Sequence, residues 1–408
     1  MFSQLLLLLI HLAFPVLASL KDLSRCDPLK KDARKPLLPI SPPTRMIKAE
    51  AEKKVTTSDC PPDPAFATKT SFDFTKATWD DQFTSFWSID SLTTQDKRQL
   101  TFNNTDGKGA AFNIWQDNQA PTLTSNKYLL FGKVSVEVQA VKGPGIITAI
   151  VLKSDSGDEI DWELLGAFEN QAQTNYFYDG QPLFNTYNTT YHLDTSSFTS
   201  SYKYGIEWTP TNLSFSINNV IRKTWHIGDI PAYKWPQTPM QVKLGIWTVS
   251  NSSDPGTVVW AGGMPNWANH DADKNPYSAY FKTIELEDYA GGCNETAKGA
   301  NVEYLYDERT TSWEGIEIKG CVKRSTPGAF PPPIASSSGA QPTQTGDGDK
   351  SHPSSSATTA EEQPSQTGEQ NPDPSESSSD ENGNAALPSG KPSSPLGAVI
   401  FLLWLLAM

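Results

Sequence analysis

The sequence has few cysteines, little positive charge and no long apolar run, and each shortage excludes a class of protein. Its 408 residues include 33 Lys and Arg against 46 Asp and Glu, a formal net charge of −13. We therefore expect no nucleic-acid partner and no basic face for an anionic membrane. The four cysteines form neither a closely spaced metal pair nor a Cys-x-x-Cys redox site, so no metal or other cofactor is expected.

Both ends of the chain carry short apolar runs that indicate a secreted and anchored protein. Residues 5–17, followed by Ala18 and Ser19, have the form of a signal peptide spanning 1–18. Residues 396–408 are too short for the roughly 20-residue helix that crosses a bilayer. With the polar stretch and the small residues before them they resemble a glycosylphosphatidylinositol (GPI) signal, with Asn384 as the attachment site and 385–408 removed. The alternative is an apolar tail that stays, which would favour aggregation.

Sequons and cysteines agree with passage through the secretory route. Glycosylation is expected at five Asn-x-Ser/Thr sites, which are Asn103, Asn188, Asn212, Asn251 and Asn294. Cysteines pair in this oxidising route. Of the three connectivities possible, we favour Cys26 with Cys60 and Cys293 with Cys321. Plasma membrane and cell wall are both expected locations for the anchored protein.

The chain between its ends divides into two kinds of composition. Residues 325–384 are rich in Ser, Thr and Pro and nearly lack branched aliphatic and aromatic side chains, so they predict a disordered, O-glycosylated spacer. Residues 61–324 predict one folded domain, preceded by an extension over 19–60 that contains the first disulfide. We expect the protein to be a monomer.

The folded region is predicted to be an all-β domain. Residues 134–141, 213–217 and 281–289 alternate polar and apolar side chains, and Asn218-Asn219 predicts a tight turn into another strand. Short strands at this spacing indicate an antiparallel β-sandwich. All tryptophans except Trp404 lie in this region. Most of them are expected in the core, although sugar sites also use flat aromatic rings.

A cluster of carboxylates suggests a catalytic site. If residues 159–164 form a strand, Glu159, Asp161 and Glu163 project on one face, and the apolar residues between them project on the other. Like charges in a row repel each other, so this arrangement costs stability unless it serves a function. A solvated acidic edge and a calcium site are alternatives, but the carboxylates lack a Gly-containing metal loop.

The spacing of the two glutamates fits a pair of glycosidase acids. Their Cα atoms lie about 13 Å apart at roughly 3.3 Å per residue. Inward-leaning side chains would bring their carboxyls to about 6 Å, close to the roughly 5 to 5.5 Å of retaining glycosidases. In that scheme one carboxylate attacks the anomeric carbon while the other protonates the leaving oxygen. Asp161 would hold the nucleophile by a shared proton and raise the pKa of the acid by its charge.

The residues Asp158-Glu-Ile-Asp-Trp-Glu163 resemble the catalytic signature of glycoside hydrolase family 16, specifically of the fungal Crh-type cell-wall transglycosylases. The resemblance covers most of residues 26–322. It rests also on Cys26-Asp-Pro-Leu, Cys60-Pro-Pro-Asp-Pro, Gly143-Pro-Gly-Ile-Ile, Gln173-Thr-Asn-Tyr-Phe, Tyr204-Gly-Ile-Glu-Trp208, Trp260-Ala-Gly-Gly263 and Trp267.

The resemblance implies a β-jelly roll whose concave sheet carries a substrate groove. It implies Glu159 as nucleophile, Asp161 as assisting carboxylate and Glu163 as acid/base. Lys243, Trp247 and Thr257 match positions that contact the sugar, together with Glu163. Tyr178-Asp179-Gly180 departs from the family by placing an acid where a cation often lies. No chitin-binding module is present in the sequence, so the groove itself must recognise the substrate.

The activity implied is cleavage of chitin and its transfer to β-glucan, with hydrolysis as a side reaction. A β-glucan hydrolase of the same fold is one alternative. A catalytically silent wall lectin or adhesin is another, although a lectin has no use for an acid placed to protonate an oxygen. The sequence alone does not distinguish water from a glycan as the acceptor.

Overall fold

The computed structural model describes residues 60–89, 96–103, 106–181, 189–230, 234–268, 274–306, 310, 312–324 and 330. All of them belong to one compact unit, formed by 1–336 and 394–408, and the second unit, 337–393, lies outside the described residues. Several expectations also fall outside: the signal peptide, most of the extension and the spacer, the GPI signal with Asn384, Cys26, Asn188 and the side chain of Asn103.

Strands dominate the described residues, with a few short helical turns between them. The strands are β1 Asp63–Pro64, β2 Lys69–Asp73, β3 Trp87–Ile89, β4 Leu100–Asn103, β5 Gly109–Ile114, β6 Thr122–Leu129, β7 Gly132–Gln139, β8 Ile146–Lys153, β9 Glu159–Leu165, β10 Gln171–Phe177, β11 Thr189–His192, β12 Tyr202–Trp208, β13 Asn212–Ile217, β14 Val220–His226, β15 Met240–Thr248, β16 Tyr277–Asp288, β17 Cys293–Thr296, β18 Glu303–Leu305, β19 Glu317–Lys319 and β20 Cys321–Arg324. The helices are α2 Asp81–Phe86 and α5 Pro255–Trp260, with 3-10 turns η2 Lys97–Gln99, η3 Ile227–Asp229, η5 Ala290–Gly292 and η6 Trp313–Gly315.

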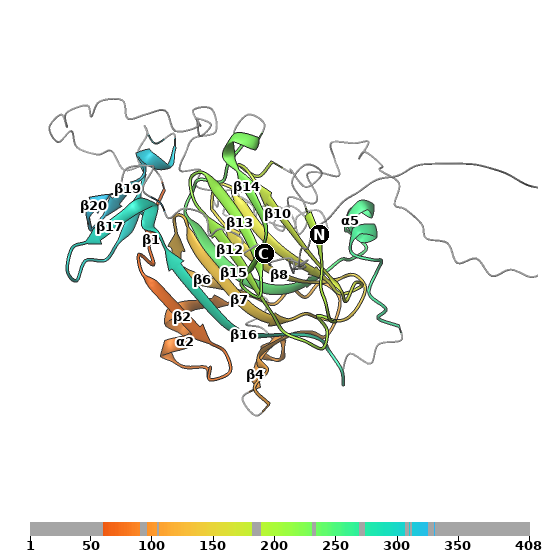
Figure 1. Ribbon diagram of the computed structural model, residues 1–408. Helices are drawn as coiled ribbons and strands as arrows, with labels where there is room; N and C mark the ends of the chain where they lie inside the picture. Colours follow the sequence, from red (N-terminus) through yellow and green to blue (C-terminus); the bar gives the residue numbers. More distant parts are fainter. Residues whose placement is uncertain are drawn as a thin grey trace, which may run out of the picture. The chain divides into compact units, whose positions relative to one another are not determined.

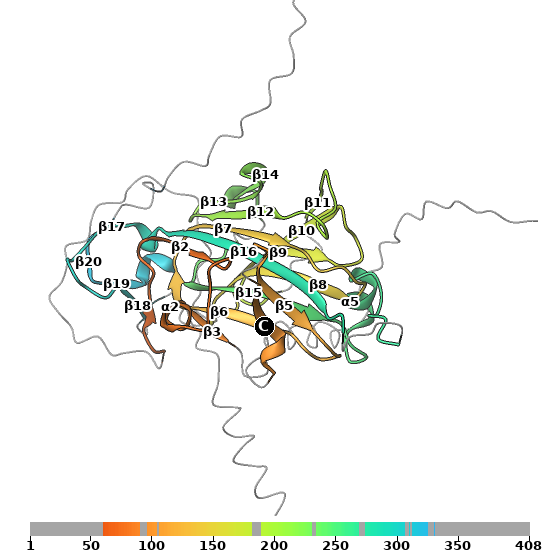
Figure 2. The ribbon, with the colours of Figure 1, turned by 90° about the horizontal axis from the view of Figure 1, so that it is seen from below.

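Two large antiparallel sheets pack face to face, which confirms the predicted all-β sandwich (Figures 1 and 2). One sheet has the order β11-β10-β9-β8-β15-β6-β3. The other has the order β14-β13-β12-β7-β16-β5-β4, and β2 also pairs with β16. A single apolar core joins them; Trp162 of β9 contacts Tyr204 and Phe215, and its indole N–H donates to the carbonyl of Gly205 at 3.0 Å.

Local sequence explains several of these elements. The predicted strands are present as β7, β13 and β16. Each begins one to four residues before its predicted start, and β7 and β16 end before their predicted ends. Asn218 and Asn219 both have positive φ, 51° and 64°, and Ile217 pairs directly with Val220. Two left-handed residues give the turn a twist that matches the flanking strands, and asparagine tolerates this conformation well. The predicted hairpin is therefore confirmed.

The C-terminal part of the domain is fixed at the end of the sandwich opposite α5 (Figures 1 and 2). A disulfide joins Cys293 of β17 to Cys321 of β20. The Arg324 guanidinium donates to several backbone carbonyls and stacks on Trp313. Phe330, which the sequence analysis assigned to the spacer, packs against Phe131 and Trp313. The packed chain therefore extends beyond the predicted boundary at 324.

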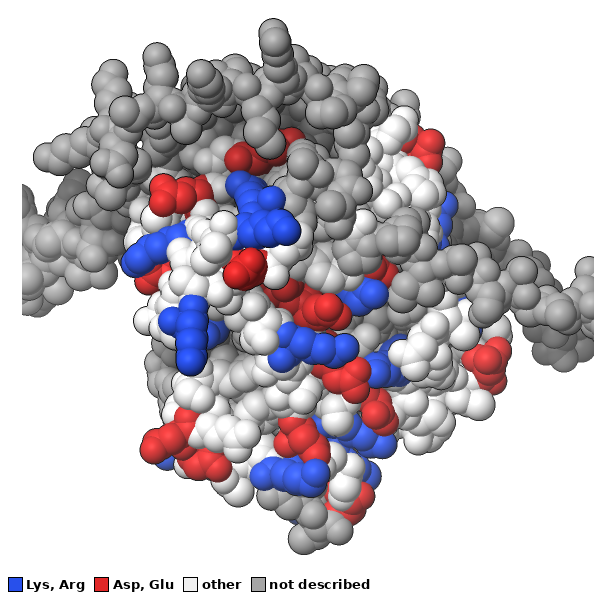
Figure 3. Space-filling view, turned by 60° about the vertical axis from the view of Figure 1, so that its left-hand side comes forward, with Lys and Arg blue, Asp and Glu red and all other residues white. Residues whose placement is uncertain are grey.

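The outer face of the eight-stranded sheet carries charges of both signs. Cross-strand ion pairs join Lys133 to Glu207, Lys203 to Glu285 and Lys282 to Glu137. Figure 3 shows positive and negative side chains interspersed on the face in view, without a large area of one sign. Paired surface charges of this kind keep a sheet face soluble, and they do not point to a polyanionic partner.

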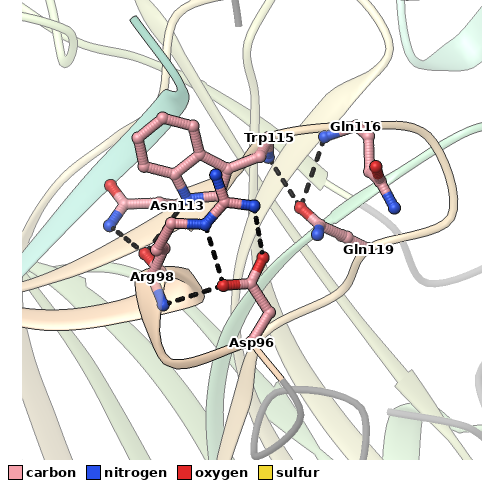
Figure 4. Close-up of polar contacts among 6 residues, drawn as sticks. All are labelled: Asp96, Arg98, Asn113, Trp115, Gln116 and Gln119. Carbon is pink, nitrogen blue, oxygen red and sulfur yellow. Dashed lines mark hydrogen bonds and ion pairs between the residues drawn. The ribbon is translucent and has the colours of Figure 1, made fainter. Parts of the chain in front are cut away.

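A polar cluster holds the connection between β5 and β6 (Figure 4). Asp96 accepts two hydrogen bonds from the Arg98 side chain, whose guanidinium lies 4.9 Å from the centre of the Trp115 ring. The Trp115 indole donates to the Arg98 carbonyl at 3.1 Å, and the Gln119 amide oxygen accepts from the Trp115 backbone. This connection leads to Ala120, which packs beside the face that carries the carboxylates.

Candidate active site

Strand β9 presents the three carboxylates on the face of its sheet that is turned away from the core. Ile160, Trp162 and Leu164 lie in the main core, as their alternation predicts. Glu159, Asp161 and Glu163 pair in register with Lys153, Val151 and Ala149 of β8, and with Phe177, Asn175 and Gln173 of β10. Val151 and Ala149 belong to a second, separate apolar cluster. We call the surface formed by these β8, β9 and β10 residues the acidic face.

The turn between β8 and β9 is tightly anchored, and Asp158 is its central residue. The Asp158 side chain is fully buried and accepts from the backbone N–H groups of Asp179, Gln237 and Thr238 and from the Thr238 hydroxyl, at 2.7 to 3.2 Å. Gly157 has φ of 93°, and a Cβ there would lie 2.8 Å from the Gly180 nitrogen. These contacts fix the residue immediately before Glu159 and therefore the direction in which β9 begins.

Two of the three carboxylates are nearly inaccessible to solvent. Glu159 is 1% exposed and Asp161 is 2% exposed, whereas Glu163 is half-buried. Lys153 forms an ion pair with the Oε2 of Glu159. Glu159 Oε1 and Asp161 Oδ1 have no hydrogen-bond donor among the described residues. Buried carboxylate oxygens without donors are costly, and such groups are concentrated where a ligand completes the contacts.

Burial and neighbouring acids raise the pKa of two of the three carboxyls. Burial raises the pKa of Asp161 well above its ordinary value; the charges of Glu159 and Glu163 raise it further, and Lys153 opposes them. Burial, and secondly the charge of Glu159, raises the pKa of Glu163 to about 8. The effect expected of the Asp161 charge on the pKa of Glu163 stays a prediction.

One member of the site is thus protonated and another is paired with a cation. Glu163 carries a proton below about pH 8 and can donate it. Glu159, next to the Lys153 ammonium, is placed to act as a carboxylate nucleophile. Asp161 lies close enough to Glu159 for the charge of Glu159 to raise its pKa, and the shared proton between them stays a prediction. Among the described residues, no group of three or more His, Cys, Asp and Glu side chains is arranged to hold a metal ion.

The predicted sugar contacts lie around this centre at different depths. Lys243 and Trp247 are on β15, which is the next strand after β8, and Lys243 pairs in register with Val151. Trp247 is only 4% exposed, because its ring stacks against Trp260 of α5 at 6.0 Å between centres. Thr257, also on α5, is buried. The more accessible ring of the pair is Trp260, whose indole N–H donates to the Gln173 side chain at 2.8 Å.

Three features of the site were not predicted from the sequence. Lys153 is six positions before Glu159, and only the register of the hairpin shows that the two meet. Asp158 was read as part of the signature without a role of its own. Trp260 and Gln173 were noted only for family resemblance, although Gln173 is directly across from Glu163. Hydrophobic periodicity does not predict which side chains meet across neighbouring strands.

The other predicted residues differ in their exposure, and some lie outside the described residues. Cys60 is disulfide-bonded, and its expected partner Cys26 lies outside the described residues. Asn251 and Asn294 are exposed, whereas Asn212 is half-buried with its side chain engaged by His226 and Thr211. No helix in the described ranges has both the length and the apolar character that a membrane span requires.

Comparison with known proteins agrees with this geometry. Residues 79–262, which include all three carboxylates, match the model of glycosyl hydrolases family 16. Crh-like protein 4 of Aspergillus fumigatus is 34% identical over 265 residues, which are 64% of this chain and 52% of that protein. The chain therefore spans about half the length of the first curated relatives that it matches.

Two solved structures support the same assignment. The apo Crh5 transglycosylase is 30% identical with a TM-score of 0.53, covering 64% of this chain and 97% of that one. The Crh5 transglycosylase in complex with NAG is 29% identical with a TM-score of 0.53, covering 64% and 96%. The expected jelly roll is thus confirmed. With the signature acids on one sheet face, the chain belongs to glycosyl hydrolases family 16.

Proposed function

We propose that the protein is a retaining transglycosylase that cleaves chitin and transfers the fragment to β-glucan in the fungal cell wall. The observation that carries this proposal is that one glutamate of the acidic face is paired with a cation while the other holds a proton. Glu159 is ion-paired with Lys153, and Glu163 holds a proton up to about pH 8. Double displacement needs this combination of a charged nucleophile and a protonated acid.

The first step uses both glutamates at once. A Glu159 carboxylate oxygen forms a bond to the anomeric carbon while the bond from that carbon to the leaving oxygen breaks. The Glu163 proton passes to the leaving oxygen, so the products are a glycosyl ester of Glu159 and an ionised Glu163. Esterification removes the negative charge of Glu159, one of the two causes that raise the pKa of Glu163. Glu163 then remains ionised more easily.

The second step returns the enzyme to its starting state. Ionised Glu163 takes the proton of an acceptor hydroxyl as that oxygen bonds to the anomeric carbon, and Glu159 leaves as a carboxylate. A glucan acceptor gives transfer, and water gives hydrolysis. Lys243, Trp247 and Thr257 are proposed to contact the sugars. Trp260 joins this set because its ring is the more accessible of the stacked pair.

The choice of substrates rests on the relatives. A solved Crh5 transglycosylase binds NAG, which is the sugar unit of chitin, and curated relatives are named Crh-like proteins. We extend this chemistry to the present chain because its signature residues lie on one sheet face. A monomer working without a metal or other cofactor is proposed.

The proposed setting is the cell surface. The signal peptide 1–18, the spacer 325–384 and the GPI signal with Asn384 would place the catalytic domain beside the wall, on a tether. Glycans at Asn103, Asn188, Asn212, Asn251 and Asn294, and a Cys26–Cys60 disulfide, belong to the same proposal. Two experiments test the anchor. Phosphatidylinositol-specific phospholipase C should release the protein from intact cells, and Asn384→Gln should abolish the anchor.

The activity is tested by incubating the protein with chitin oligosaccharides and a fluorescently labelled β-glucan oligosaccharide. The expected result is label in larger, hybrid products, and no such products with Glu159→Gln. Shortened donor without labelled hybrids would replace the transferase by a hydrolase. Cleavage of β-glucan alone would favour the glucanase alternative. Binding of either polymer without any cleavage would favour a lectin.

A further inference from the structure

We infer that Lys153 is a positioning residue that holds one oxygen of Glu159 and directs its other oxygen at the anomeric carbon. This inference rests on the proposed function, since it assigns a role next to the proposed nucleophile. It adds a cation from β8 to a site so far described by its acids.

The register of the β8–β9 hairpin brings the two side chains together. Lys153 is the last residue of β8 and Glu159 is the first residue of β9, and they are direct cross-strand partners. Such partners have Cβ atoms about 5 Å apart on the same side of the sheet. The turn between them is fixed by Gly157 and by the buried carboxylate of Asp158. The pairing therefore depends on a rigid part of the fold.

Burial separates this lysine from ordinary surface lysines. Its side chain is 13% exposed and that of Glu159 is 2% exposed. A buried ammonium and a buried carboxylate each destabilise the fold unless they are paired. By contrast, Lys203, which pairs with Glu285 on the other sheet, faces a glutamate that is 58% exposed. Exposed pairs of that kind contribute little.

The ion pair distinguishes the two oxygens of Glu159. Lys153 takes Oε2, while Oε1 has no hydrogen-bond donor in the described part of the chain. A carboxylate held at one oxygen can rotate less and presents the other in one direction. Oε1 is therefore the oxygen assigned to attack.

The remaining charged groups around Glu159 do not replace Lys153. On β9 they are Asp161 and Glu163, which are both acids, and β10 faces it with the uncharged Phe177 and Asn175. Asp179 lies in the turn after β10 and Asp158 precedes β9, and both are acids. On β15 the residue across from Lys153 is the uncharged Gln241, and the cation Lys243 pairs with Val151 instead.

The chain offers a matched control on the opposite sheet. Lys133 and Glu207 are also direct cross-strand partners, with Nζ and Oε1 at 3.3 Å and side chains 34% and 10% exposed. Lys133→Met removes a Lys–Glu pair of similar geometry from the eight-stranded sheet. It reports the general effect of losing such a pair, without touching the acidic face.

The experiment compares Lys153→Met, Lys153→Arg and Lys133→Met with the wild type. The first readout is kcat and KM for transfer from chitin oligosaccharides to a labelled glucan oligosaccharide. In Lys153→Met we expect kcat to fall about 10- to 100-fold with little change in KM, because the attacking oxygen is no longer held in place. Lys153→Arg should restore most of kcat, and Lys133→Met should change neither value. An unchanged kcat in Lys153→Met would overturn the role of Lys153.

The second readout does not depend on substrate. It is the Tm of these variants and of the double variant Lys153→Met/Glu159→Gln. Lys153→Met leaves the buried Glu159 side chain without its cation and should lower Tm more than Lys133→Met does, and the double variant should recover most of that loss. Equal Tm values in Lys153→Met and Lys133→Met would overturn the role of Lys153. A wild type inactive on chitin, with Tm lowered selectively in Lys153→Met, would overturn the proposed function alone.

Discussion

Individual side chains on the acidic face have different surroundings although all three are carboxylic acids. Glu159 lies beside the Lys153 ammonium, and Asp161 is buried between two acids. The charge of Glu159 helps to raise the pKa of Glu163. One site can perform both acid and base chemistry when it holds two acids whose pKa values differ. The roles therefore follow from neighbours that lie on β8 and β9.

The raised pKa of Glu163 predicts an upper pH limit for activity. Its pKa lies at about 8 against an ordinary 4.5, so the protonated acid required for the first step is present below about pH 8 and is lost above it. We expect kcat/KM to fall as pH rises through this value. Glu163→Gln should remove this limit and lower the rate on chitin oligosaccharides at least 100-fold.

An activated donor provides the control for Glu163. A dinitrophenyl glycoside needs no proton on its leaving group, so its first cleavage should remain fast in Glu163→Gln. Equal loss on activated and ordinary donors would contradict the acid role, because it would indicate damage to the whole site.

Trp260 provides a second prediction about a single side chain. Its ring stacks on Trp247 and its N–H contacts Gln173, which is across from Glu163. Trp260→Ala should lower kcat/KM about 3- to 10-fold, mainly through KM, as expected for the loss of one stacking contact. The control is Trp79→Ala. Trp79 is 50% exposed and packs on Phe83 and Phe102, far in sequence from the carboxylates. Equal KM changes in both would exclude a sugar contact for Trp260.

Strands and turns show which parts of the site are readable from sequence. Alternation predicted that Glu159 and Glu163 share a face, because strand geometry is local. The Asn218-Asn219 turn was predicted for the same reason. Alternation does not predict that β8 lies between β9 and β15, since strand order depends on packing between distant segments. Lys153 and Gln173 were missed because their pairing with the glutamates depends on the register of the β8–β9 and β9–β10 hairpins. Trp260 was missed because it is far in sequence from Gln173, which it contacts.

The β8–β9 turn can be tested through Asp158. Its buried carboxylate accepts from three backbone N–H groups and one hydroxyl. Asp158→Ala leaves these donors unpaired and should lower the free energy of unfolding by about 3 to 5 kcal/mol. For a domain of this size that is a fall in Tm of roughly 10 °C. Thermal unfolding followed by circular dichroism measures it.

The control for Asp158 is an acid outside the core. Asp229 is exposed on η3, so Asp229→Ala should change Tm by no more than about 2 °C. A Tm unchanged by Asp158→Ala would contradict the anchoring role of this residue.

The molecule as a whole carries further buried acids away from the site, and they make stability depend on pH. Burial raises the pKa of Asp63 from 3.8 to about 7, opposed by the Tyr306 hydroxyl and assisted by Asp155. Burial also raises the pKa of Asp288 to about 6. Both residues bind protons more tightly in the folded state than in the unfolded chain. Their contribution is therefore fully present below about pH 4 and is lost as pH rises to 6 or 7.

We expect Tm to fall by several degrees between pH 4.5 and pH 7.5. Asp63→Asn should reduce this fall, since an amide keeps an acceptor for Tyr306 and does not titrate. The contribution of Asp63 across the range is at most roughly 4 kcal/mol. Calorimetry of both proteins over this range measures it, and an identical slope in Asp63→Asn would contradict the shifted pKa.

The most direct test of the mechanism is to detect the covalent intermediate on Glu159. Glu163→Gln should form the glycosyl ester from a dinitrophenyl chitin disaccharide and break it down slowly, because the base of the second step is missing. Intact-mass and peptide mass spectrometry should then show one added disaccharide, located on Glu159. An adduct on another residue would contradict the assignment. Rapid cleavage with no adduct would indicate that the acetamido group of the sugar, and not Glu159, is the nucleophile.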